Sequence, residues 1–180
     1  MKVINLFGPP GVGKSVISAA VYADLAKNNL NVELVQEFAK QLVYEQRTEL
    51  LKTDQLYILS NQNRKLGILK DRSLDYVVID SPLLLQTIYN NPENLSQEIF
   101  EPLVLELFNK YDNINFLLER GKEYQYQTIG RVHTLEESDK IGGRIKEKLE
   151  YYHIPYYSIK SNNRTVGKIV SKIFELKMNE

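Results

Sequence analysis

The sequence has no cysteine, no tryptophan and only two histidines, and it contains no uninterrupted apolar run of about 18 residues. Without cysteine the chain forms no disulfide bond and has no thiol for catalysis. His133 and His153 lie far apart in the sequence, which argues against a histidine-based metal site. No charged segment leads into an apolar stretch near the N-terminus, so nothing resembles a secretory signal. We therefore expect a cytoplasmic protein with no membrane partner.

The chain also has no excess of charge of either sign, because 23 acidic residues balance 23 basic ones. A neutral chain has no overall attraction to nucleic acid, although a local basic patch would still bind it. The length of 180 residues, with 43% hydrophobic and 26% charged residues, fits one ordinary globular domain spanning residues 1–180. Composition leaves the oligomeric state open, with a homodimer among the alternatives.

What the sequence does contain is a phosphate-binding motif near its start. The stretch GPPGVGKS, residues 8–15, fits the pattern G-x-x-x-x-G-K-[ST]. A predicted buried strand, residues 2–7, precedes the stretch, and a predicted helix, residues 16–27, follows it. This is the context in which the motif binds a nucleotide triphosphate, here ATP. The predicted nucleotide contacts are Gly8, Pro9, Pro10, Gly11, Val12, Gly13, Lys14, Ser15 and Val16.

Strands and helices alternate along the rest of the chain. Further strands are predicted at 32–36, 76–80, 114–118 and 155–159, and further helices at 37–46, 53–70, 95–110, 134–151 and 165–177. Ser81 and Pro82 are predicted to be the N-cap and the first residue of another helix. Alternation of this kind predicts an α/β fold, with a five-stranded parallel sheet and helices on both faces. Ligands of such a sheet bind at the carboxyl ends of its strands.

Two carboxylates stand at predicted strand ends. Asp80 ends the apolar segment VVID, where a phosphate-loop protein carries the acid that holds Mg²⁺, so Ser15 and Asp80 form the predicted metal site. The alternative for Asp80 is a helix cap or a loop residue. Glu37 follows VELVQ, where a carboxylate can accept a proton from an attacking hydroxyl or orient it. The alternative for Glu37 is a solvated residue that interacts favourably with a helix dipole.

Three arginines flank a polar, tyrosine-rich segment that has no apolar periodicity, residues 121–130. Phosphoryl transfer spreads negative charge over the transferred group, and arginines that close on the group stabilise that charge. A closing segment also excludes water. We therefore predict a lid at about residues 120–134, with Lys14, Glu37, Asp80, Arg120, Arg131 and Arg144 as the catalytic set. The alternative for each arginine is an ordinary surface cation.

Two glutamines share one stripe of the predicted helix at 53–70. Gln55 and Gln62 recur at helical spacing with apolar residues of that helix. An amide offers a donor and an acceptor together, which suits a base edge or a carboxamide, so Gln55 and Gln62 join Glu37 as candidate substrate contacts. The simpler alternative is that both amides flank the apolar stripe and touch water, as polar groups at a stripe edge commonly do.

With these residues assembled, the chain resembles the small P-loop kinases of nucleosides and nucleotides. The resemblance rests on GPPGVGKS, on VQEFAK, on VVIDSP and on residues 115–159. It is similar to ribosylnicotinamide-kinase-like proteins and to phage kinases of thymidylate-kinase type, including those that phosphorylate 5-hydroxymethyluracil in DNA. The resemblance implies a three-layer P-loop kinase fold with a lid, ATP and Mg²⁺ as cofactors, and an adenine-binding loop near residues 161–165.

The sequence leaves the phosphate acceptor open. The first hypothesis is a phosphotransferase that moves the γ-phosphate of ATP to a hydroxyl of a small nucleoside- or nucleotide-like acceptor. The second is a kinase of modified bases within DNA, and the third is a nucleotide-dependent ATPase or switch that acts with a partner. Deoxynucleoside kinases typically carry an arginine directly after the strand-three acid, whereas Ser81 and Pro82 follow Asp80 here. That departure argues against a plain deoxynucleoside kinase.

Overall fold

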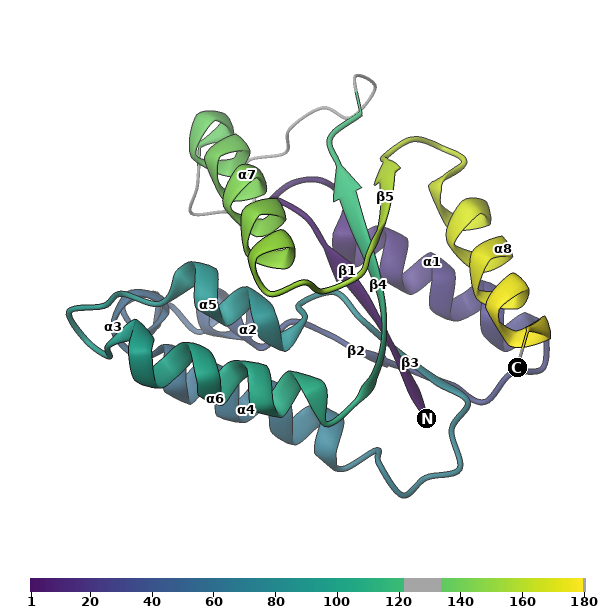
Figure 1. The fold of residues 1–180 in the computed structure, drawn as a ribbon, viewed down its shortest axis with the longest axis horizontal. Helices are drawn as coiled ribbons and strands as arrows, with labels where there is room; N and C mark the ends of the chain where they lie inside the picture. The colour runs from purple at the N-terminus through teal and green to yellow at the C-terminus, as the bar shows by residue number, and fades with distance from the viewer. Residues whose placement is uncertain (122–133, 180) are drawn as a thin grey trace.

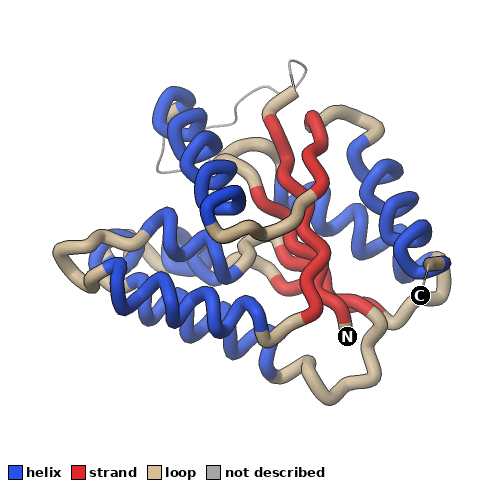
Figure 2. Tube along the Cα trace, viewed as in Figure 1, coloured by secondary structure: helices blue, strands red, loops and turns tan. Residues whose placement is uncertain are grey.

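A five-stranded, all-parallel sheet forms the middle layer of the structure, a computed structural model that describes residues 1–121 and 134–179 (Figure 2). The strand order is β2-β3-β1-β4-β5. The strands are β1 (Lys2–Phe7), β2 (Val32–Val35), β3 (Tyr76–Ile79), β4 (Asp112–Glu119) and β5 (Tyr157–Lys160). The predicted α/β fold with helices on both faces is therefore confirmed, and β1, which carries the phosphate-binding motif at its end, is the central strand.

Helices cover both faces of the sheet (Figure 1). On one face lie α1 (Lys14–Lys27) and α8 (Thr165–Met178). The other face carries α4 (Gln55–Gly67), the 3-10 turn η1 (Leu83–Leu85), α5 (Gln86–Tyr89), α6 (Gln97–Asn109) and α7 (Leu135–Tyr151). Two shorter helices, α2 (Phe38–Tyr44) and α3 (Leu50–Thr53), pack against α4. Because β2, β3 and β1 are neighbouring parallel strands, the loops that follow them lie together at the carboxyl end of the sheet.

Side chains of β1 alternate between the two apolar cores. Ile4 and Leu6 pack with α1 and α8, whereas Val3 and Phe7 pack on the opposite face. Burial on both faces explains why the central strands are almost continuously apolar. The exception is Asn5, whose Nδ2 donates to Asn113 Oδ1 at 2.8 Å and to Asn115 Oδ1 at 3.0 Å. These amide bonds satisfy buried polar groups and link β1 to β4.

Two predicted helix starts are confirmed and one is wrong. The helix predicted at 53–70 is α4, and Asp54 is its N-cap, whose side chain accepts a hydrogen bond from Tyr57 N at 2.9 Å. The separate short helix α3, which ends at Thr53, was not predicted. Ser81 is not an N-cap: Pro82 occupies that position with extended backbone and no side-chain cap bond, and a 3-10 turn follows it. The capping box of Thr134 and Glu137 at the start of α7 is confirmed.

Part of the predicted lid, with Arg131 and His133, lies outside the described residues. Within the described ranges, the helices are all too short or too polar to cross a membrane.

Candidate active site

The phosphate loop joins β1 to α1 and takes backbone angles that favour glycine. Gly8, Gly11 and Gly13 all have positive φ, at 150°, 80° and 94°. At Gly8 a side chain is also excluded by space, because an ideal Cβ would lie 2.7 Å from Leu118 O. Lys14 Nζ donates to Gly8 O at 2.7 Å and to Pro9 O at 3.1 Å, so the lysine lies across its own loop. The arrangement leaves backbone N–H groups and the N-terminus of α1 to bind an anion.

Asp80 directly follows β3, the neighbour of β1, so it lies beside the phosphate loop. Its side chain is only 3% exposed, and within the described residues its Oδ1 has no hydrogen-bond partner. A buried carboxylate oxygen without a donor fits a hard cation or a metal-bound water. Ser15, exposed in the first turn of α1, is the second oxygen donor of the predicted site. No cluster of three or more acidic, histidine or cysteine side chains occurs within the described ranges.

Glu37 lies between β2 and α2, where it is the N-cap residue of α2 without a side-chain cap bond. Lys65 of α4 reaches the same place: its Nζ donates to Gln36 O at 3.1 Å and lies 5.5 Å from the centre of the Phe38 ring. Burial lowers the pKa of Lys65, while the negative charges of Asp80 and Glu37 act to raise it. The charges of both predicted catalytic carboxylates therefore act on the same lysine.

Sequence reasoning missed Lys65, because no motif marks it. A signal was nevertheless present, since Lys65 stands three residues after Gln62 and so lies on the same side of α4 as the glutamine stripe. Its contact with Gln36, next to Glu37, depends on how α4 packs against the end of β2.

The alternative, that Gln55 and Gln62 flank the stripe and touch water, is wrong, because they are 5% and 1% exposed. Gln62 Oε1 accepts a hydrogen bond from Phe38 N at 2.9 Å, which fixes the residue that follows Glu37. Gln55 Nε2 donates to Leu51 O at 2.6 Å. Within the described residues, Gln62 Nε2 and Gln55 Oε1 are buried without hydrogen-bond partners. Both glutamines thus hold backbone groups in place.

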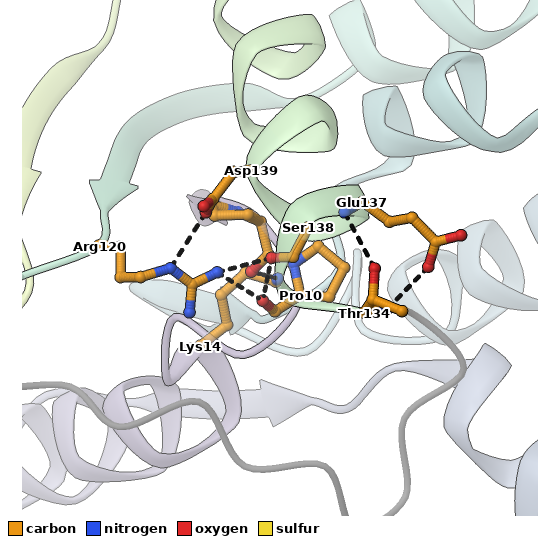
Figure 3. A network of polar contacts seen from close by, with 8 residues as sticks. Pro10, Lys14, Arg120, Thr134, Glu137, Ser138 and Asp139 are labelled. Carbon is orange, nitrogen blue, oxygen red and sulfur yellow. Dashed lines mark hydrogen bonds and ion pairs between the residues drawn. The ribbon is translucent and has the colours of Figure 1, made fainter.

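Arg120 and Arg144 take up different positions. Arg120, at the end of β4, lies over the phosphate loop, where its guanidinium contacts Pro10, Ser138 and Asp139 (Figure 3). Arg144 instead donates from Nη2 to Ile88 O at 2.8 Å, at the α5 side of the site. Next to it, burial and the charge of Glu37 raise the pKa of Tyr89, and Arg144 opposes that shift. The structure therefore places one arginine near the phosphate loop and the other on the side of Glu37.

The loop after β5 meets the end of β4. Ser161 is fully buried, and its N–H donates to Glu119 O at 2.9 Å. An ideal Cβ on Gly121 would lie only 1.9 Å from Ser161 O, so this close approach requires glycine. The segment in which adenine binding is expected is thus held against the strand that leads to Arg120.

Residues 3–165 match the AAA domain family AAA_28. Three solved structures share the fold at low sequence identity. The chain matches deoxyadenosine kinase from M. mycoides with bound dCTP at 17% identity and a TM-score of 0.63, covering 99% of this chain and 100% of that one. It matches thymidylate kinase from Ehrlichia chaffeensis at 16% identity and a TM-score of 0.60, with 98% of each chain covered. It also matches NadR in complex with NAD and AMP-PNP at 13% identity and a TM-score of 0.70, covering 97% of this chain and 49% of that one.

Proposed function

The chain belongs to the AAA domain family AAA_28, and from this premise we propose that it is an ATP-dependent phosphotransferase, which moves the γ-phosphate to a hydroxyl of a nucleoside- or nucleotide-like acceptor. A P-loop domain of this kind binds nucleotide, and the fold is that of nucleoside and nucleotide kinases. The finer assignment, transfer to such an acceptor, rests on the residues around the loop.

One observation carries the proposal: two carboxylates follow adjacent parallel strands, β2 and β3, at the same carboxyl end of the sheet as the phosphate loop. Lys65 Nζ donates to Gln36 O, next to Glu37, and the charges of both carboxylates act to raise its pKa. Their surroundings differ, which suits two roles. Asp80 is buried and keeps an oxygen without a donor, so with Ser15 it would hold Mg²⁺, which when bound neutralises charge on the β- and γ-phosphates. Glu37 is only half-buried and stands at the start of α2, so it can meet a hydroxyl that enters from solvent.

The chemistry that follows is proton transfer from the acceptor hydroxyl to Glu37 as the hydroxyl oxygen attacks the γ-phosphorus, while the bond from that phosphorus to the β-phosphate oxygen breaks and ADP leaves. Lys14 balances charge on the phosphates, and Arg120 lies where it can close on the transferred group. Arg144, on the side of Glu37, is better placed to contact the acceptor than the phosphates. Arg131 keeps the lid role assigned from the sequence. Gln55 and Gln62 supply an amide acceptor and an amide donor for the acceptor molecule.

The test is a transfer screen with γ-labelled ATP and Mg²⁺. It offers nucleosides, mononucleotides, nicotinamide riboside and hydroxymethylated DNA side by side, since the acceptor class is open. Lys14→Ala is expected to abolish transfer with the fold intact, because Lys14 contacts its own loop and not the core. Lys27→Ala, an exposed lysine at the other end of α1, is the matched control and is expected to leave transfer unchanged. Equal activity of the two variants would remove the basis of the proposal.

A further inference from the structure

Helix α7 rests directly on the outside of the phosphate loop through two small residues one turn apart. Ser138 is fully buried, and its Oγ donates to Pro10 O at 2.6 Å. Gly142 faces Pro9, because an ideal Cβ on Gly142 would lie 3.4 Å from Pro9 Cβ and Cγ. The neighbouring Gly143 faces open space, since its ideal Cβ would meet nothing within 4 Å. The face of α7 that carries Ser138 and Gly142 therefore packs closely against the phosphate loop, whereas the face of Gly143 does not.

Arg120 completes this contact from β4 (Figure 3). Its Nη2 donates to Ser138 Oγ at 2.6 Å and lies 3.4 Å from Pro10 O, while its Nε donates to Asp139 Oδ1 at 3.2 Å. The Ser138 hydroxyl thus accepts from the arginine and donates to the loop. Pro10 O receives two donors, so the orientation of this carbonyl is fixed from outside the loop.

Fixing one carbonyl fixes the next N–H as well. A trans peptide is planar, and its C=O and N–H point in opposite directions. With Pro10 O turned toward α7, the N–H of Gly11 must point away from α7. Gly11 has a φ of 80°, and a glycine there would otherwise rotate freely between alternative loop conformations. A loop whose N–H groups are already oriented loses less conformational entropy when phosphate binds.

We propose that Ser138 and Gly142 are positioning residues for the phosphate loop, so that nucleotide affinity depends on how α7 rests on Pro9 and Pro10. The proposal uses only the nucleotide-binding part of the function proposed above and holds for any reaction that follows.

Calorimetric titration with ADP measures the effect. Ser138→Ala removes one donor from Pro10 O, so we expect the dissociation constant to rise by about five- to tenfold, as loss of one buried hydrogen bond allows. Thr87→Val is the matched control, because it removes a buried hydroxyl whose hydrogen bond, at 2.8 Å, goes to Leu84 O and not to the phosphate loop. Gly142→Leu is expected to weaken ADP binding and Gly143→Leu to leave it unchanged, although both substitutions add the same side chain to α7.

Hydrogen exchange supplies a readout that a merely structural role would not move. Coupling between two sites is reciprocal, so bound ADP must in turn strengthen the contact of α7. In the wild-type protein, ADP is expected to slow exchange of the amides of residues 138–145, and in Ser138→Ala this protection should be lost. Wild-type ADP affinity in both Ser138→Ala and Gly142→Leu, or undiminished protection by ADP in Ser138→Ala, would overturn the proposal. If ADP fails to bind the wild-type protein at all, the nucleotide-binding function fails instead.

Discussion

Gln62 is the residue whose substitution tests the packing around Glu37 most sharply. Its Oε1 is the acceptor for the N–H of Phe38, the first residue of α2, at 2.9 Å. Phe38 is itself buried, so no water can replace the glutamine. We consider Gln62→Met, which keeps the length and apolar stem of the side chain and removes only its amide.

The expected loss of stability in Gln62→Met follows from the polar group that loses its hydrogen-bond partner and from the one that is removed. A buried N–H without an acceptor costs about 1–3 kcal/mol. The substitution also removes Gln62 Nε2, which within the described residues is buried without a partner, and this offsets part of the cost. We therefore expect a net loss of about 1–2 kcal/mol in the free energy of unfolding. For a chain of this length that corresponds to a fall in Tm of roughly 2–8 °C.

Two assays follow the change. Urea unfolding gives the free energy of unfolding, and steady-state transfer kinetics give kcat. We expect kcat to fall, because the residue before Phe38 is the proposed base, Glu37. The affinity for ATP is expected to stay near the wild-type value. Gln55→Met is the matched control for the unfolding measurement, with the same substitution two turns earlier on the same face of α4. Its lost partner is the carbonyl of Leu51 and not an amide of α2. Unchanged stability and kcat in Gln62→Met would refute this account of Gln62.

Three further predictions concern Asp80, Glu37 and the contact of Gly121 with the loop after β5. Asp80→Asn should lower the transfer rate steeply and weaken its dependence on Mg²⁺; a wild-type rate across a Mg²⁺ titration would leave Asp80 as a structural residue. Glu37→Gln should lower kcat by about 10²–10⁴-fold and leave ATP binding nearly unchanged, as expected for loss of a general base. Weaker ATP binding with a normal kcat would contradict that role. Gly121→Ala should lower Tm and weaken ADP binding more than tripolyphosphate binding, because the new Cβ would push against Ser161 O in the loop expected to hold adenine. Parallel losses for the two ligands would place adenine elsewhere.

The parts of the fold that local sequence determines were predictable. The phosphate loop could be placed because the motif, the apolar strand before it and the helix after it are contiguous in the chain. The start of α7 could be placed because a capping box needs only residues three apart. The parallel sheet followed from the alternation of strands and helices, and its order is a property of the fold class.

The contacts that join distant segments were not predictable. Sequence spacing grouped Arg120 with Arg144, yet the first lies against Pro10 and the second against Ile88. Arg120 directly follows β4, whereas Arg144 lies on α7 where that helix packs against α5. The burial of Gln55 and Gln62 depends on how α2 and α3 cover α4, which periodicity along one helix does not reveal. Lys65 and Ser138 carry no motif at all, and only the packed structure brings them to Glu37 and to the phosphate loop.

The central claim is that the γ-phosphate of ATP is transferred to an acceptor hydroxyl and not to water. Following the γ-label in a single turnover tests this claim most directly. The label is separated into acceptor-bound phosphate and inorganic phosphate, with and without each acceptor of the panel. We predict that label appears in the acceptor, at a rate that rises with acceptor concentration and is lost in Lys14→Ala. Release of all the label as inorganic phosphate, at a rate indifferent to every acceptor, would contradict the claim and identify the protein as a nucleotide hydrolase or switch.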